Sequence, residues 1–170
     1  MKHHIIIYIV LIALTLGCKN QGTVYNDPIP KHESLKINSE FTNEERTINI
    51  WTPPNCSSSQ DSLTVLYMAD GGIKEDFPHI ANTLDTLIKQ HKIPNLILVG
   101  IENTERRRDL TGPSNIEYDL EFIKNPGGAE NFRKFIKNEL FPEINKRYRT
   151  TDKKAIIGES LAGLFVVETL

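Results

Sequence analysis

Three strand-like segments, each followed by a turn, most constrain how this 170-residue chain can fold. They lie in SLTVLYMADGG, NLILVGIEN and KKAIIGES, and the first two are nearly continuous in apolar residues. Strands of that kind are typical of a sheet covered by helices on both faces. Apolar residues at helical spacing predict helices over Phe77–Gln90 and 127–148. This alternation predicts an α/β fold with a mostly parallel central sheet.

Two earlier segments, HESLKINSEF and ERTINIWTPP, predict a pair of antiparallel strands at an edge of that sheet. In the second segment Ile48 and Ile50 alternate with polar residues, which is the pattern of a half-buried strand. The second long helix contains Pro142, which has no amide hydrogen to continue the helical ladder. We therefore expect a kink or a break at Pro142.

The N-terminal residues form a separate region. After Lys2, an apolar run ends at Leu16, which is short for a membrane span of about 20 residues and resembles the core of a secretion signal. The stretch LTLGC, Leu14–Cys18, overlaps the end of this run and resembles the lipobox of bacterial lipoproteins, although Leu16 stands where a smaller residue is usual. The resemblance implies a lipidated Cys18 that anchors the chain to a bacterial membrane, on the periplasmic or surface side of the cell envelope. The alternatives are an uncleaved anchor and an ordinary secretion signal.

These features divide the chain into three parts. We predict a lipoprotein-type signal peptide at 1–17, a tether at 18–32, and an α/β domain over 33–170. The formal net charge of −2 and a pI near 6.2 give no basic field for nucleic acid, and we expect none as a partner. No paired cysteines, H-E-x-x-H motif or phosphate-binding loop is present, so we predict no metal and no cofactor.

The segment GESLAG, which follows the last strand, has the pattern of a nucleophile elbow around Ser160. In such an elbow the serine sits on a sharp strand-to-helix turn, and the residues two before and two after it must be small. Gly158 and Ala162 meet this need, although glycine is more usual at the second position. The alternative is a serine that caps an ordinary helix.

An acyl-transfer site also needs donors for the oxyanion. The amide of Leu161 lies at the expected start of the helix, where the helix dipole favours negative charge. A second donor comes from the loop after an earlier strand. We expect it to be the amide of Gly71 or of Asp70.

Four segments together resemble the Putative esterase family of α/β-hydrolases, which includes esterase D and the enterochelin esterases. They are YMADGG, VGIENTERRRDLTGP, GGAENFRKFIKNELFPEINKRYRT and IIGESLAG, and they follow one another in the order seen in that family. The resemblance covers Arg46–Leu170. It implies an α/β-hydrolase-type three-layer sandwich with antiparallel N-terminal strands. It also implies that Ser160 attacks an ester carbonyl to form an acyl-enzyme, and that Leu161 with the Asp70/Gly71 turn forms the oxyanion hole.

The base and acid that a catalytic serine needs are missing from the sequence after Ser160. In this fold the acid and then the histidine follow the serine, yet no histidine follows it here. We expect the chain to be the front part of a longer hydrolase, with the C-terminal part of the fold missing and the fragment itself inactive. The alternative is an upstream base, for which His79 is the candidate because it starts near the oxyanion loop.

The loop after the second buried strand offers candidate substrate contacts. Asn103 and Arg107 follow Ile101 and are expected to bind an anionic or catechol-like group, the alternative being a solvated loop held by local ion pairs. The expected substrate is a small-molecule or polysaccharide-linked ester. Two other functions stay open, namely an acyltransferase on the same fold and a surface lipoprotein that binds without turnover.

Overall fold

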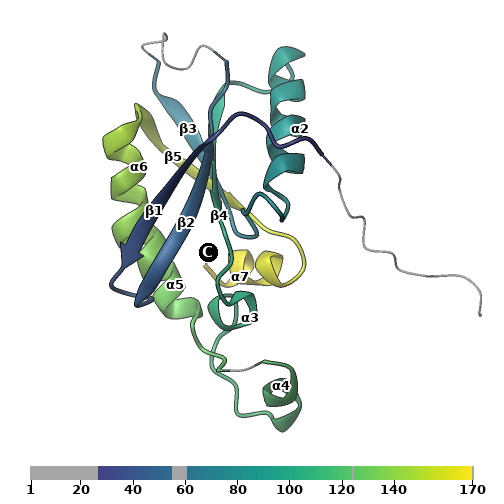
Figure 1. Cartoon of the computed structure of the whole chain (residues 1–170), viewed down its shortest axis with the longest axis vertical. Helices are drawn as coiled ribbons and strands as arrows, with labels where there is room; N and C mark the ends of the chain where they lie inside the picture. Colours follow the sequence, from purple (N-terminus) through teal and green to yellow (C-terminus); the bar gives the residue numbers. More distant parts are fainter. Residues whose placement is uncertain (1–26, 55–60, 124, 170) are drawn as a thin grey trace, which may run out of the picture.

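The computed structural model describes residues 27–54, 61–123 and 125–169 (Figure 1). The predicted signal peptide, Cys18 and most of the tether lie outside the described residues. The elements in chain order are β1 (Glu33–Ser39), β2 (Glu44–Trp51), β3 (Leu63–Met68), α2 (Phe77–Lys89), β4 (Leu96–Ile101), α3 (Arg106–Asp109), α4 (Glu117–Phe122), α5 (Ala129–Phe135), η1 (Ile136–Leu140), α6 (Phe141–Arg147), β5 (Thr150–Ile157) and α7 (Leu161–Thr169).

The five strands form one mixed sheet in the order β1-β2-β4-β3-β5. β3 pairs in parallel with β4 and with β5, whereas β2 pairs antiparallel with β1 and with β4. The prediction of a mostly parallel sheet with antiparallel N-terminal strands is therefore confirmed. β3 is an internal strand with hydrogen-bonded neighbours on both sides, and this position explains why its sequence is almost wholly apolar.

Helices cover both faces of the sheet, which gives three layers (Figure 1). On one face, α2 packs Phe77, Ala81 and Leu84 against Trp51, Met68 and Leu98 of the sheet. The larger core lies on the other face, where α5, η1 and α6 meet β3 and β4. Phe165 of α7 joins this second core, with its ring centroid 5.4 Å from that of Phe132. The architecture is the three-layer α/β-hydrolase type.

The expected disturbance near Pro142 takes the form of a π-helical turn. The helix runs from α5 through η1 into α6 without a break, and Pro142 stands in the first turn of α6. A proline ring clashes with the carbonyl four residues earlier in a regular α-helix, and a π turn widens the spacing there. The wider turn lets the chain accept Pro142 while Leu140 and Ile144 stay in the core.

The last residues of the predicted tether differ from a solvated linker, because they lie along α2. The Nδ1 atom of His79 is 3.0 Å from a carboxylate oxygen of Asp27, and Asn82 donates to the carbonyl of Pro28. The ring of His32 packs edge-on against Phe77. Within the described ranges no helix combines the length and the apolar content needed to cross a bilayer.

Candidate active site

The carboxyl ends of β3, β4 and β5 bring three loops to the same end of the sheet. They carry Asp70 after β3, Asn103 and Arg106 after β4, and Ser160 after β5. In an open α/β sheet, ligands bind outside the carboxyl ends of parallel strands. The predicted site residues Asp70, Asn103 and Ser160 therefore converge, together with Arg106, on the end of the sheet where a ligand is expected.

The turn that carries Ser160 is sharp and strained. β5 ends at Ile157 and α7 begins at Leu161, so three residues connect a strand to a helix. Ser160 has a φ of 55°, a left-handed conformation that residues other than glycine rarely adopt. Its side chain is exposed, and none of the residues that the structure describes makes a hydrogen bond to its hydroxyl. The sharp turn predicted from the sequence is present.

Close packing inside this turn explains the glycine two residues before the serine. A β-carbon at Gly158 would lie 2.5 Å from the carbonyl carbon and oxygen of Ala162. No real β-carbon approaches backbone atoms so closely, so a side chain would force the strand and the helix apart. Gly158 is thus required by the geometry of the turn.

A substitution at this glycine gives a first prediction. In the full-length protein, Gly158→Val should distort the turn and abolish reaction of Ser160 with a fluorophosphonate probe, while the sheet stays folded because β5 itself is not altered. Labelling is measured by intact-protein mass spectrometry and folding by circular dichroism. Gly112→Val is the matched control, since no atom lies within 4 Å of a β-carbon placed at Gly112. Equal labelling of both variants would contradict the assigned geometry.

The two candidate amides for the second oxyanion donor differ in their partners. The amide of Gly71 donates to the carbonyl of Ile101 at 2.9 Å, and a β-carbon at Gly71 would lie 2.2 Å from the amide nitrogen of Ile101. The amide of Asp70 has no hydrogen-bond partner in the described part of the chain. Asp70 also has a left-handed φ of 56°. Of the two alternatives, the amide that is available to a ligand is that of Asp70.

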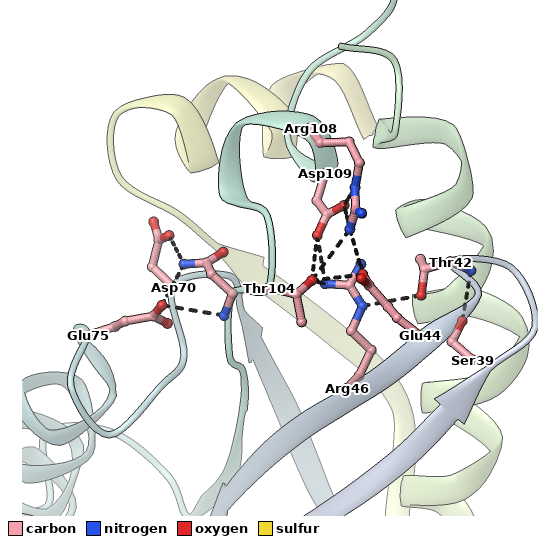
Figure 2. A network of polar contacts seen from close by, with 10 residues as sticks. Ser39, Thr42, Glu44, Arg46, Asp70, Glu75, Thr104, Arg108 and Asp109 are labelled. Atoms are coloured by element: carbon pink, nitrogen blue, oxygen red, sulfur yellow. Dashed lines mark hydrogen bonds and ion pairs between the residues drawn. The ribbon is translucent and has the colours of Figure 1, made fainter. Parts of the chain in front are cut away.

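The carboxylate of Asp70 is held by the loop after β4. Arg106 donates from Nε at 2.5 Å and from Nη2 at 2.8 Å, one bond to each carboxylate oxygen. The side-chain amide of Asn103 donates to Asp70 at 2.7 Å and to Glu75 at 2.9 Å (Figure 2). Glu75 in turn accepts a hydrogen bond from the amide of Gly72. These contacts tie the loops after β3 and β4 into one polar cluster.

The adjacent arginines Arg106 and Arg107 have different surroundings. Arg107 is exposed, and its guanidinium donates to the carbonyl of Phe122 in α4. Arg106, with a side chain 37% exposed, faces Asp70. Arg107 was the predicted substrate contact, but Arg106 is the arginine that lies against Asp70 at the candidate site. One helical residue turns a side chain by about 100°, and position in the run alone does not fix which arginine faces inward.

Asp76, which precedes α2, shows that the elbow and the loop after β3 are neighbours. Its pKa is raised, chiefly because partial burial disfavours the charged form and also because of the negative charges of Asp70 and Glu159. Glu159 belongs to the turn that carries Ser160. The elbow and the Asp70 loop therefore both lie within electrostatic range of Asp76.

The raised pKa of Asp76 predicts how the free energy of unfolding depends on pH. The folded state holds the Asp76 proton to a higher pH than the unfolded chain does, whose aspartate pKa is about 4. Stability linked to Asp76 is therefore full below that range and is lost as the pH rises through the raised pKa. Asp76→Asn should be close to wild type in stability at low pH and gain on it as the pH rises. Urea unfolding between acid and neutral pH measures this, and an unchanging difference would contradict it.

The histidines of the described region lie on or beside α2. The ring of His79, the upstream candidate base, is paired with Asp27, and His91 follows the end of the helix with a φ of 54°. No hydrogen bond between the described histidines and Ser160 is present. The described residues thus place an exposed serine and the unpartnered amide of Asp70 at this end of the sheet, and they show no histidine hydrogen-bonded to that serine.

The chain is similar in sequence and in structure to known esterases and hydrolases. The model of the Putative esterase family matches residues 39–169. Ferri-bacillibactin esterase BesA of Bacillus subtilis is 32% identical over 168 residues, which is 89% of this chain and 57% of BesA. The crystal structure of an IroE-like serine hydrolase from Shewanella oneidensis is 32% identical with a TM-score of 0.72, covering 82% of this chain and 46% of that one. The BES protein from Bacillus cereus is 25% identical with a TM-score of 0.66, at 84% and 59% coverage. The chain spans about half the length of the curated relatives it matches.

Proposed function

Because the chain belongs to the Putative esterase family, we propose that the full-length protein is a serine ester hydrolase that works through an acyl-enzyme on Ser160. The observation that carries the proposal is the elbow, where an exposed serine in a left-handed conformation stands between β5 and α7. A helix-capping serine would not need this strained backbone. The names of the relatives, which include a ferri-bacillibactin esterase, point to the same reaction class.

The proposed reaction has two steps. In the first, the Ser160 Oγ attacks the ester carbonyl carbon and its proton passes to a base, while the carbonyl oxygen becomes an oxyanion. The amides of Leu161 and Asp70 donate to that oxyanion, and neither has a competing partner in the described part of the chain. The C–O bond then breaks, and the alcohol leaves with the proton. In the second step, water attacks the acyl-enzyme by the same route and releases the acid.

We propose that the base and the acid come from a further part of a longer protein. The curated relatives are nearly twice as long as the stretch they share with this chain. β5 is the last strand of the sheet order among the described residues, and its outer edge carries no neighbour there. Beside it, Leu164 and Val167 of α7 are 51% and 69% exposed, which is unusual for apolar residues on one helix. A further strand and helix would cover both surfaces.

Val167 tests this part of the proposal. Val167→Asp should leave the unfolding free energy of the 170-residue chain within about 0.5 kcal/mol of wild type, because the site is exposed. In a full-length protein that covers α7, the same change should cost more than about 2 kcal/mol, because an ionised carboxylate would be buried without a partner. Urea unfolding of both lengths measures the two values, with Glu168→Gln as the exposed control. Equal small effects in both lengths would contradict the proposed cover.

The substrate that we propose is a small-molecule or polysaccharide-linked ester. The direct test is hydrolysis of a set of simple and siderophore-type esters by the full-length protein, together with fluorophosphonate labelling of Ser160. Acceptor alcohols added to the assay separate hydrolysis from acyl transfer by the products formed. A full-length protein that is neither labelled nor active would show a binding protein instead.

We also propose that a lipid on Cys18 attaches the protein to a bacterial membrane at the cell envelope. The support is the LTLGC sequence alone, since these residues lie outside the described ranges. Cys18→Ala should move the protein from the membrane fraction to the soluble fraction, and metabolic labelling with a fatty acid should be lost. An unchanged distribution would argue for one of the other two kinds of signal.

A further inference from the structure

We propose that Arg106 is a positioning residue for the oxyanion hole, acting through the carboxylate of Asp70. This inference rests on the proposed function, because it concerns the donor that would stabilise the oxyanion. Arg106 holds the Asp70 side chain in place and balances its negative charge beside the amide that faces the reacting oxygen.

The backbone of Asp70 needs outside support to keep its conformation. A left-handed residue other than glycine persists only where its surroundings hold it. For Asp70 these surroundings are the two hydrogen bonds from Arg106, the one from Asn103, and a bond from the amide of Asp76 to the Asp70 carbonyl at 3.2 Å. Arg106 supplies both members of the bidentate pair, which is the geometry that fixes a carboxylate most firmly.

The charge of Asp70 makes the second part of the argument. The same residue carries the proposed donor amide and a carboxylate whose side chain is only 10% exposed. A negative charge so close to a forming oxyanion would oppose it, and water screens a poorly exposed group weakly. The guanidinium of Arg106 lies against that carboxylate and cancels its charge. Arg106 therefore keeps an acidic residue compatible with an oxyanion hole.

A buried ion pair between β2 and α3 holds the loop that carries Arg106. Asp109, at the other end of α3, is 2.6 Å from the guanidinium of Arg46, whose side chain is fully buried in β2 (Figure 2). Arg46 also donates to Thr104 at 2.7 Å and lies over the ring of Phe132. Because Thr104 and Asp109 stand on either side of Arg106 in the chain, these contacts hold the backbone of Arg106 independently of its contact with Asp70.

The test compares kcat and KM for the wild type and four variants of the full-length protein. Arg106→Gln leaves the Asp70 charge unbalanced and should lower kcat about 10- to 100-fold, which is less than the loss of kcat when a whole oxyanion donor is removed. KM should change less than about threefold. Asp70→Asn with Arg106→Gln removes both charges and should recover at least about tenfold of that loss. Asp70→Asn alone is the fourth member of this double-mutant cycle, which measures the coupling between the two side chains. Arg147→Gln is the matched control, an arginine in exposed ion pairs with Glu33 and Glu143.

The outcomes separate this inference from the proposed function. If wild type hydrolyses esters and Arg106→Gln matches Arg147→Gln, only the role of Arg106 is overturned. The same holds if the double variant is no faster than Arg106→Gln, or if the whole loss is in KM, which would indicate substrate binding. If wild type neither hydrolyses esters nor reacts at Ser160 with a fluorophosphonate, the proposed function falls and the role of Arg106 falls with it.

Discussion

Ser160→Ala should lower ester hydrolysis by the full-length protein by a factor on the order of 10⁴ to 10⁶, because an acyl-enzyme cannot form without the serine oxygen. The fold should be unaffected, since the Ser160 side chain is exposed and makes no hydrogen bond with the rest of the described chain. Initial rates with an activated ester measure the loss, and mass spectrometry after fluorophosphonate treatment shows whether the labelled site is gone.

Ser114→Ala is the control for this experiment. Ser114 donates a hydrogen bond to Asp119 near α4, away from the elbow, and its loss should leave the rate close to wild type. Activity or labelling that persists in Ser160→Ala would show that the nucleophile is another residue. Such a result would overturn the proposed function, even though the family and the fold would stand.

Arg46→Met should destabilise the folded chain by about 3–5 kcal/mol, because it leaves a buried carboxylate without its partner. Asp109 has a side chain only 3% exposed, and Arg46 is one of the two arginines that contact it. Arg46 also pairs with Glu44 at 2.6 Å, so the change removes more than one interaction. Urea unfolding of the 170-residue chain measures the loss of free energy.

Two further variants show whether the loss comes from the unpaired charge. Arg46→Met combined with Asp109→Asn should regain part of the stability, since the uncompensated charge is gone. Arg147→Gln, which breaks only exposed ion pairs, should leave the free energy of unfolding close to that of the wild type. A loss for Arg46→Met as small as that for Arg147→Gln would show that the buried network contributes little to stability.

The sheet, α2 and the long helix from α5 to α6 were predictable from the sequence because their signals are local, whereas α3 and α4 were not predicted. An apolar run such as LTVLYM is interpretable without knowing its neighbours, and the spacing in α2 shows its buried side. The turn at Ser160 was predictable for a similar reason, since small residues on both sides of a serine have few other uses between a strand and a helix. At Pro142 a kink or a break was predicted, whereas the helix continues through a π turn, because these three outcomes leave the same trace in the sequence.

The polar contacts of the candidate site were harder to predict, because they join residues far apart in the chain. Arg46 and Asp109 are 63 positions apart, and each looks like an ordinary surface charge in its own segment. The same is true of Asp70 and Arg106, which are 36 positions apart. The sequence allowed the amide of Gly71 as an oxyanion donor, but in the folded chain this amide donates to the carbonyl of Ile101 at the end of β4.

The sequence by itself determined that this chain forms an α/β sheet and bends sharply around Ser160, because periodicity and side-chain size act over a few neighbouring residues. Only the tertiary structure decided which amide stays available and which arginine faces Asp70. Those outcomes depend on how the strands are ordered and how closely their loops approach, and no single segment carries that information.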